Sequence, residues 1–240
     1  MAKNVTDGQL VNMIYELTST MIGINLFPYQ QQPAKRIIRS VIKNDGDELT
    51  SLQARQSGKS EVVTFALSGL MVFLPILANN PFFAGDTRLE PFKNGIMIGV
   101  FGPALQQSQI IFNRVRSRLG SDRAVEFMQD PEIGVSMEIS NGENVSLSNG
   151  SFMSAVSASV GSNIEGRSYH LIIVDEAQDV NDTKYSKSIS PMGAFYNATK
   201  VLIGTPNFSK GFFFYAIERN KRNYANKTGR RNHFEYNWEY

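Results

Sequence analysis

Apolar residues follow two kinds of spacing along this chain, and each kind predicts a different element. Spacing of three and four residues predicts helices over 7–20, 29–43, 59–77 and 104–119. Short apolar runs bounded by Gly, Asn or Pro predict strands at 49–54, 96–101, 135–139, 145–147, 152–156, 171–174 and 201–203. Helices alternating with strands predict an α/β fold with a mainly parallel sheet and helices on both of its faces.

The longest apolar stretch covers 62–78 and is broken by Thr64, Ser68, Gly69 and Pro75. It is shorter than the ~20 apolar residues that span a bilayer. The first ten residues, MAKNVTDGQL, lack the apolar region of a signal peptide. We therefore expect a buried helix here and no membrane partner.

Composition limits the chemistry that this chain can perform. The 240 residues suit one large domain with at most a small appendage. Cysteine is absent and only two histidines occur, which excludes disulfides, thiolate metal sites and a histidine-rich centre. Any metal should therefore have oxygen ligands, which favours Mg²⁺. A net charge of +2 neither requires nor excludes nucleic acid.

A candidate phosphate-binding loop follows the strand predicted at 49–54, with the sequence Gln53-Ala54-Arg55-Gln56-Ser57-Gly58-Lys59-Ser60. Lys59 would reach the outer phosphates of a nucleotide, and Ser60 would hold Mg²⁺ through its hydroxyl. Backbone N–H groups of such a loop point at phosphate, so Arg55, Gln56, Ser57 and Gly58 join the expected nucleotide site. Gln53 stands where the usual pattern G-x-x-x-x-G-K-[ST] has glycine. A chance Gly-Lys-Ser at a helix start is the alternative, but the preceding strand and following apolar helix argue against it.

The second candidate motif is an apolar strand, Leu171-Ile172-Ile173-Val174, that ends in two carboxylates. Asp175 suits the Mg²⁺ shell, and Glu176 suits the general base that polarises the attacking water. Taken alone, this motif is equally a buried strand that meets a solvated acidic turn. Paired with a phosphate loop, it predicts nucleotide hydrolysis, because hydrolysis needs both parts.

Two weaker motifs complete the predicted site. Thr205 and Asn207 follow a further apolar strand and could report the state of the γ-phosphate, although a simple strand-ending turn has the same sequence. Tyr29 could stack on adenine, and the Gln30 amide could pair with the edge of the base. A solvated glutamine at a helix start is the alternative for Gln30.

Basic residues supply the last candidates. Phosphoryl transfer usually needs an arginine on the leaving charge, and Arg55 and Arg167 are placed for it, with a surface salt bridge as the alternative for Arg167. A basic segment near the end of the chain could follow a nucleic-acid backbone or form only a solvated face. Its candidate DNA-binding residues are Arg219, Lys221, Arg222, Arg230 and Arg231.

With these motifs in this order, the chain resembles the ATPase domain of the large terminase subunit, the DNA-packaging motor of tailed bacteriophages. The resemblance covers about 27–214. It includes the phosphate loop without its first glycine, the acidic strand and the Gly204-Thr205-Pro206-Asn207 coupling motif. It also includes Leu147-Ser148-Asn149-Gly150-Ser151, Gly166-Arg167-Ser168 and Gly211-Phe212-Phe213-Phe214-Tyr215.

The resemblance implies a P-loop NTPase of the RecA/ASCE type with a small N-terminal helical lid element. It divides the chain into a helical appendage (1–26), the ATPase domain (27–215) and a basic extension towards a nuclease domain (216–240). The acidic cluster of such a nuclease is not in this sequence, which would fit either an excised motor domain or a motor without a nuclease.

The same resemblance implies an ATP- and Mg²⁺-dependent motor that moves double-stranded DNA into a procapsid. It implies a ring of subunits, usually a pentamer, at the capsid portal, with a small terminase subunit as a further partner. Arg167 would serve the neighbouring subunit's nucleotide, and Arg55 its own. The motor would work in the cytoplasm of the infected host and would not remain in the mature virion.

Three other functions stay open at this point. Asp175-Glu176-Ala177-Gln178 resembles a helicase acidic box, but no residues remain for a helicase's second motor domain. A regulatory nucleotide-binding module would have no need of Glu176. A DNA-binding scaffold would make the motifs coincidental.

Overall fold

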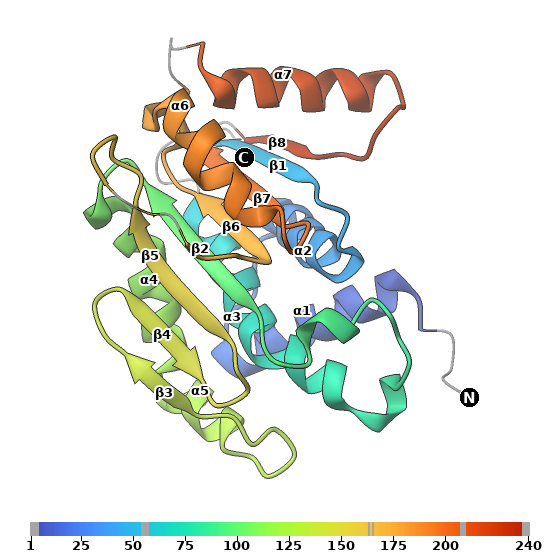
Figure 1. The fold of residues 1–240 in the computed structure, drawn as a ribbon. Helices are drawn as coiled ribbons and strands as arrows, with labels where there is room; N and C mark the ends of the chain where they lie inside the picture. Colours follow the sequence, from blue (N-terminus) through green and yellow to red (C-terminus); the bar gives the residue numbers. More distant parts are fainter. Residues whose placement is uncertain (1–4, 54–57, 163, 165, 207–209, 237–240) are drawn as a thin grey trace.

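The structure is a computed structural model that describes residues 5–53, 58–162, 164, 166–206 and 210–236. Its centre is an eight-stranded sheet with the order β3-β4-β5-β2-β6-β7-β1-β8 (Figure 1). The strands are β1 (Glu48–Gln53), β2 (Met97–Gly102), β3 (Met137–Ser140), β4 (Asn144–Leu147), β5 (Phe152–Ser157), β6 (Leu171–Val174), β7 (Thr199–Gly204) and β8 (His233–Tyr236).

Most neighbouring strands are parallel. The run β5-β2-β6-β7-β1-β8 is parallel throughout, whereas β3, β4 and β5 form an antiparallel meander at one side. This confirms the predicted mainly parallel α/β sheet. The run also places β7 between β1, which precedes the phosphate loop, and β6, which precedes the two carboxylates.

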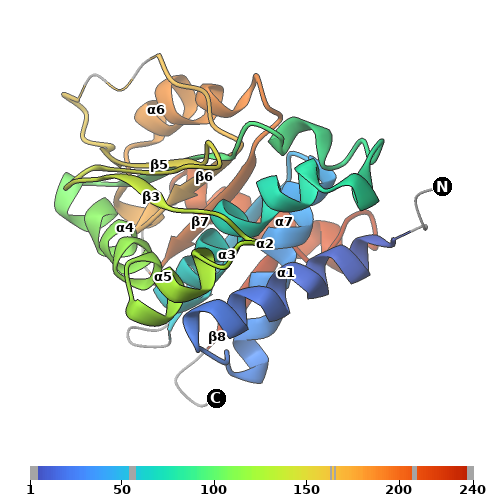
Figure 2. The same ribbon diagram turned by 90° about the horizontal axis from the view of Figure 1, so that it is seen from below.

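One face of the sheet is covered by the first five helices (Figure 2). They are α1 (Asp7–Ile22), α2 (Pro28–Lys43), α3 (Lys59–Asn79), α4 (Leu105–Leu119) and α5 (Asp122–Met128). Among the described residues α3 is the helix long and apolar enough to cross a membrane, yet 89% of its apolar window is buried in the protein. It therefore serves as the core helix that the sequence predicts.

Shorter elements cover the opposite face. After β6 the chain passes through η3 (Ala177–Asp179), α6 (Asp182–Lys184), η4 (Tyr185–Ile189) and η5 (Ser190–Gly193) before it enters β7. Helix α7 (Phe212–Ala225) lies beside them and packs against β1, β8 and η3, and its Phe213, Ala216 and Ile217 belong to one apolar cluster with residues of β6 and β7. Helices thus lie on both faces, as predicted.

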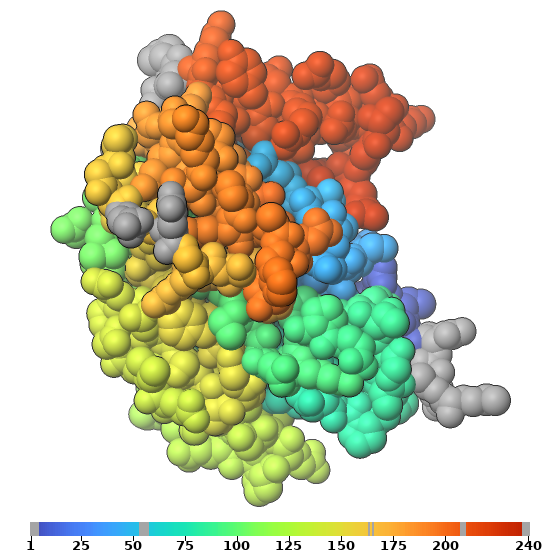
Figure 3. Space-filling view, viewed as in Figure 1, coloured from blue at the N-terminus to red at the C-terminus, as the bar shows by residue number. Residues whose placement is uncertain are grey.

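The segment expected as a basic extension, 216–240, joins the sheet where the structure describes it. It ends α7 and forms β8, which pairs in parallel with β1 from Thr50↔His233 to Gln53↔Tyr236. Figure 3 shows these carboxyl-terminal residues in red beside the light-blue residues that lead into β1. The boundaries 1–26, 27–215 and 216–240 stay predictions.

Candidate nucleotide-hydrolysis site

Three strands end at the same edge of the sheet, and each is followed by a predicted functional segment. Strand β1 leads to the phosphate loop, β6 to Asp175 and Glu176, and β7 to Thr205. Because β6, β7 and β1 are adjacent and parallel, their carboxyl ends converge. Ligands of open α/β sheets bind at such an edge.

Lys59 and Glu176 meet at this edge although 117 positions separate them. Lys59 is the first residue of α3, and its Nζ donates to Glu176 Oε1 at 2.5 Å. Glu176 has a left-handed backbone with φ of 47°, which is uncommon for a residue with a side chain. Residues held in such conformations cluster at functional sites. The structure therefore brings together the predicted phosphate-binding lysine and the predicted base.

Gly58, which precedes α3 in the predicted phosphate loop, lies against α2. Its φ is 81°, and a Cβ built there would lie 2.3 Å from Gln30 Nε2. Glycine is the residue that this conformation and this close approach require. Gln30 is buried, and its Oε1 accepts from the Phe27 backbone N–H at 3.0 Å. Gln30 thus lies between the start of α2 and Gly58.

An aromatic group lies at the start of α2. The rings of Phe27 and Tyr29 are stacked, with centroids 6.1 Å apart, and Tyr29 lies 5.3 Å from the ring of Tyr236 at the end of β8. The sequence proposed Tyr29 for base stacking but did not single out Tyr236. The signal was missing because β8 was not predicted as a strand.

Asp175 is the buried carboxylate of the site, with 3% of its surface exposed. Burial raises the pKa of Asp175, the Lys59 ammonium lowers it and the neighbouring Glu176 raises it, and together these effects bring it to about 6. A carboxylate that is shielded from water is stabilised in its charged form by a cation, which fits the magnesium role proposed for Asp175.

No group of three or more His, Asp or Glu side chains gathers to hold a metal among the residues that the structure describes. The oxygen ligands that the sequence predicts are Asp175 and Ser60, the second residue of α3.

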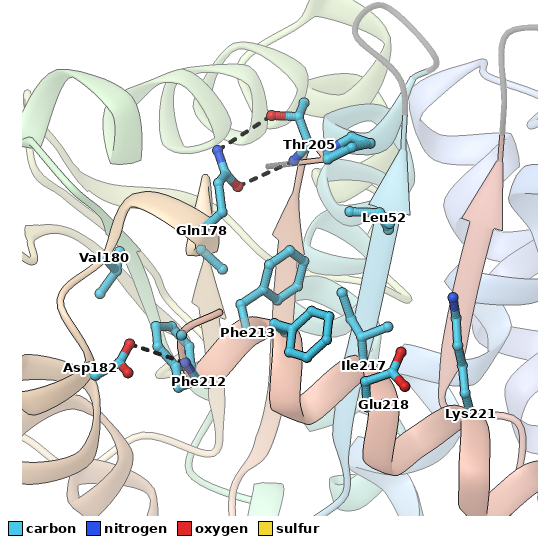
Figure 4. Close-up of a pocket in the computed structure, with 14 residues that line it drawn as sticks. Leu52, Gln178, Val180, Asp182, Thr205, Phe212, Phe213, Ile217, Glu218 and Lys221 are labelled. Atoms are coloured by element: carbon cyan, nitrogen blue, oxygen red, sulfur yellow. Dashed lines mark hydrogen bonds between the residues drawn. The ribbon is translucent and has the colours of Figure 1, made fainter. Parts of the chain in front are cut away.

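Gln178 connects the ends of β6 and β7, a role that the sequence did not reveal. Its Nε2 donates to Glu176 Oε2 at 2.8 Å, and its Oε1 accepts from the Thr205 backbone N–H at 3.2 Å. Figure 4 shows the two contacts between Gln178 and Thr205. The helicase-like phrase Asp175-Glu176-Ala177-Gln178 contains this residue, but its partner Thr205 lies 27 positions away.

Below this connection lies a mostly apolar cavity of about 210 Å³ (Figure 4). Leu52, Val180, Phe212, Phe213 and Ile217 supply its apolar walls, and Asp182, Glu218 and Lys221 supply charge. Asp182 Oδ1 accepts from the Phe212 backbone N–H at 3.0 Å, which fixes the start of α7 next to the cavity. Gln178 and Thr205 line the cavity at the side nearest the site.

Two arginines of α4 approach the site. Arg118 pairs with Glu61 in the first turn of α3. The charge of Arg114 lowers the pKa of Asp175.

Arg167 lies away from Lys59 and Glu176. It is exposed, and its guanidinium sits 5.2 Å from the centroid of the Phe152 ring, at the start of β5. Arg55, Gln56, Ser57 and Asn207 lie outside the described residues.

Most of the candidate DNA-binding residues contact other side chains of the chain. Arg219 pairs with Glu48 at 2.5 Å, Lys221 with Glu235 at 2.8 Å, and Arg230 with Asp45 at 2.6 Å. Arg231 donates to Gln32 at 2.8 Å, and Arg222 is exposed. The Lys221 pair lies within this segment, whereas the contacts of Arg219, Arg230 and Arg231 join it to α2, to the start of β1 and to the turn between them. DNA binding by this segment stays a prediction.

Comparisons with known proteins place this architecture among solved folds. No protein-family model matches the sequence, and no curated protein matches it. The large terminase ATPase domain of Thermus phage P74-26 superposes with a TM-score of 0.57 at 17% identity, over 82% of this chain and 71% of that one. The large terminase of bacteriophage HK97 superposes with a TM-score of 0.56 at 17% identity, over 92% of this chain and 44% of that one. The chain therefore has the α/β fold of phage large terminase ATPase domains, as the order of its motifs predicts.

Proposed function

We propose that this chain is a magnesium-dependent ATPase that drives the packaging of double-stranded DNA into a phage procapsid. The observation that carries the proposal is the contact between Lys59 and Glu176 at the edge where β1, β6 and β7 end. A lysine at the start of a buried helix and a carboxylate after a buried strand are the two parts that ATP hydrolysis requires. The shared fold of terminase ATPase domains supports the same activity.

Each side chain has a distinct task in this proposal. Lys59 binds the outer phosphates of ATP together with the N–H groups at the start of α3. Glu176 then accepts a proton from the attacking water, since binding of ATP at Lys59 would release it from the ion pair seen here. Ser60 and Asp175 would hold Mg²⁺, which would neutralise phosphate charge during transfer. Gln30 lies against Gly58, and Tyr29 precedes it at the start of α2, so the two side chains could contact the base.

The arginines complete the proposed chemistry. Arg167 is exposed and does not contact Lys59 or Glu176, which suits a role towards the nucleotide of a neighbouring subunit in a ring. Arg55 would act within its own subunit. The ring, its usual five members, the portal, the small terminase subunit and the host cytoplasm follow from the resemblance and are proposed with it.

The runner-up function is a helicase-like ATPase, and a regulatory nucleotide-binding module is the third. The sequence motif Asp175-Glu176-Ala177-Gln178 supports the helicase function. Stimulation of ATP hydrolysis by portal or procapsid would favour packaging, whereas stimulation by single-stranded nucleic acid would favour unwinding. Nucleotide binding without hydrolysis would favour the regulatory module.

Substitution of the proposed base tests the proposed hydrolysis. We expect Glu176→Gln to keep ATP affinity and to lower phosphate release by about 10²-fold or more, because the amide cannot accept the proton. Lys59→Ala should weaken ATP binding itself. The measurement is phosphate release and binding of a fluorescent ATP analogue, with the exposed Glu132→Gln as a matched control. Unchanged phosphate release by Glu176→Gln would show that Glu176 is not the base.

A further inference from the structure

The carboxylate of Glu176 is held at both of its oxygens, by two side chains of different chemistry. Lys59 Nζ donates to Oε1 at 2.5 Å, and Gln178 Nε2 donates to Oε2 at 2.8 Å. The lysine contact must change when Lys59 binds phosphate. The amide contact need not change, because Gln178 belongs to the same turn as Glu176. Gln178 can therefore keep the carboxylate oriented after the lysine has left.

The same amide also holds the end of β7. Gln178 Oε1 accepts from the Thr205 backbone N–H at 3.2 Å, and its Nε2 lies 3.4 Å from Thr205 Oγ1. A third contact joins Nε2 to Asp179 Oδ2 at 3.0 Å. The amide of Gln178 carries a donor and an acceptor on separate atoms, so it donates to Glu176 and accepts from Thr205 at once.

Strand β7 leaves room for this side chain. Gly204 is the last residue of β7, and a Cβ built on it would lie 2.3 Å from Gln178 Oε1. Any larger residue at this position would displace the amide. The absence of a side chain at Gly204 therefore leaves the space that the Gln178 side chain occupies. The contact is thus part of the packing between β7 and the turn after β6.

We propose that Gln178 is a positioning residue that orients the Glu176 carboxylate and links it to Thr205. The inference rests on the proposed ATPase function and deepens it. A displacement at the end of β7, where Thr205 lies, would reach Glu176 through one side chain. In this proposal, Gln178 contacts neither ATP nor the attacking water.

Two substitutions separate positioning from simple packing. Gln178→Met keeps nearly the same volume and removes the hydrogen bonds to Glu176, Asp179 and Thr205. Gln178→Glu keeps an acceptor for the Thr205 N–H, loses the donor to Glu176 Oε2 and adds a repelling charge. We expect both variants to lower kcat by about tenfold or more, with KM for ATP changed less than threefold, as for residues that orient another catalytic group.

The controls separate this inference from the proposed function. Gln129→Met, at an exposed site at the end of α5, should leave kcat unchanged. A wild-type protein without ATPase activity would overturn the proposed function, whereas an active wild type with full kcat in Gln178→Glu would overturn the positioning role alone. If Gln178→Met unfolds below the assay temperature, Gln178→Glu carries the test.

A double-mutant cycle examines the link to β7. Thr205→Val removes the hydroxyl and keeps the backbone N–H, so its effect on kcat should not add to that of Gln178→Met if the two residues act through one connection. Additive effects would mean that Gln178 does not transmit a change from Thr205 to Glu176.

Discussion

At the residue scale, position and burial determine which side chains can titrate or react. Glu176 is partly exposed and is held by a lysine and an amide, whereas Asp175 next to it is buried. Two neighbouring carboxylates therefore have different surroundings, which allows one to bind a cation and the other to accept a proton. Glu176 also has a left-handed backbone, with φ of 47°.

His170 lies outside the candidate site, and its pKa also depends on burial. It is buried, it stacks on Tyr196 with a centroid distance of 3.7 Å, and its Nδ1 accepts from the Met97 backbone N–H at 3.0 Å. Burial lowers its pKa from 6.5 to about 4. The folded protein thus keeps His170 neutral, while the unfolded chain binds a proton below pH 6.5.

We predict that acid destabilises the fold through His170. Stability should be fully present above pH 6.5 and should fall as the pH drops towards 4, because the unfolded state then binds the extra proton. By pH 5 the loss from this residue should be about 1–2 kcal/mol. Urea unfolding at pH 7.5 and pH 5 measures it, and His170→Asn should show a smaller drop than wild type. An equal drop in both proteins would exclude His170 as the cause.

At the element scale, β8 has a structural role that the charged residues near it in the sequence do not indicate. It covers the outer edge of β1, the strand that leads into the phosphate loop. Phe234 of β8 is 4% exposed and lines a small cavity with Ile37 of α2 and Leu49 of β1. The strand therefore completes the side of the sheet on which the loop begins.

We predict that removing the ring of Phe234 destabilises the domain far more than removing an exposed aromatic ring. Phe234→Ala should lower the free energy of unfolding by about 3–5 kcal/mol, because it removes a buried aromatic ring. Tyr224→Ala, at a side chain that is 56% exposed on α7, should change it by about 0.5 kcal/mol or less. Denaturant unfolding compares the two variants. Equal small effects would mean that β8 adds little to the fold.

At the scale of the whole molecule, the sequence predicted the elements whose apolar residues are continuous or regularly spaced. Strands β1, β2, β6 and β7, helix α3 and the antiparallel meander all lie where the pattern placed them, within two residues at each end. Parallel order then followed from the alternation of strands and helices. This was enough to bring Lys59 and Glu176 to one edge of the sheet.

The remaining features depend on contacts that a linear pattern does not contain. Strand β8 has four residues, His233-Phe234-Glu235-Tyr236, within a highly charged segment, so its alternation was hidden. Gln178 matters only because Thr205 and the bare backbone of Gly204 lie beside it in the fold. The charge of 219–231 suggested DNA contacts, but the acidic partners of Arg219 and Arg230 precede or begin β1, far away in the sequence.

The proposed ATPase function depends on whether a nucleotide binds between Lys59 and Glu176. A crystal structure with magnesium and a non-hydrolysable ATP analogue measures this directly. We predict the γ-phosphate within hydrogen-bond distance of Lys59 Nζ, with the Glu176 carboxylate freed from that lysine and facing the phosphorus. A nucleotide bound elsewhere, for example in the cavity beside Phe212 and Phe213, with the contact between Lys59 and Glu176 intact, would contradict the account.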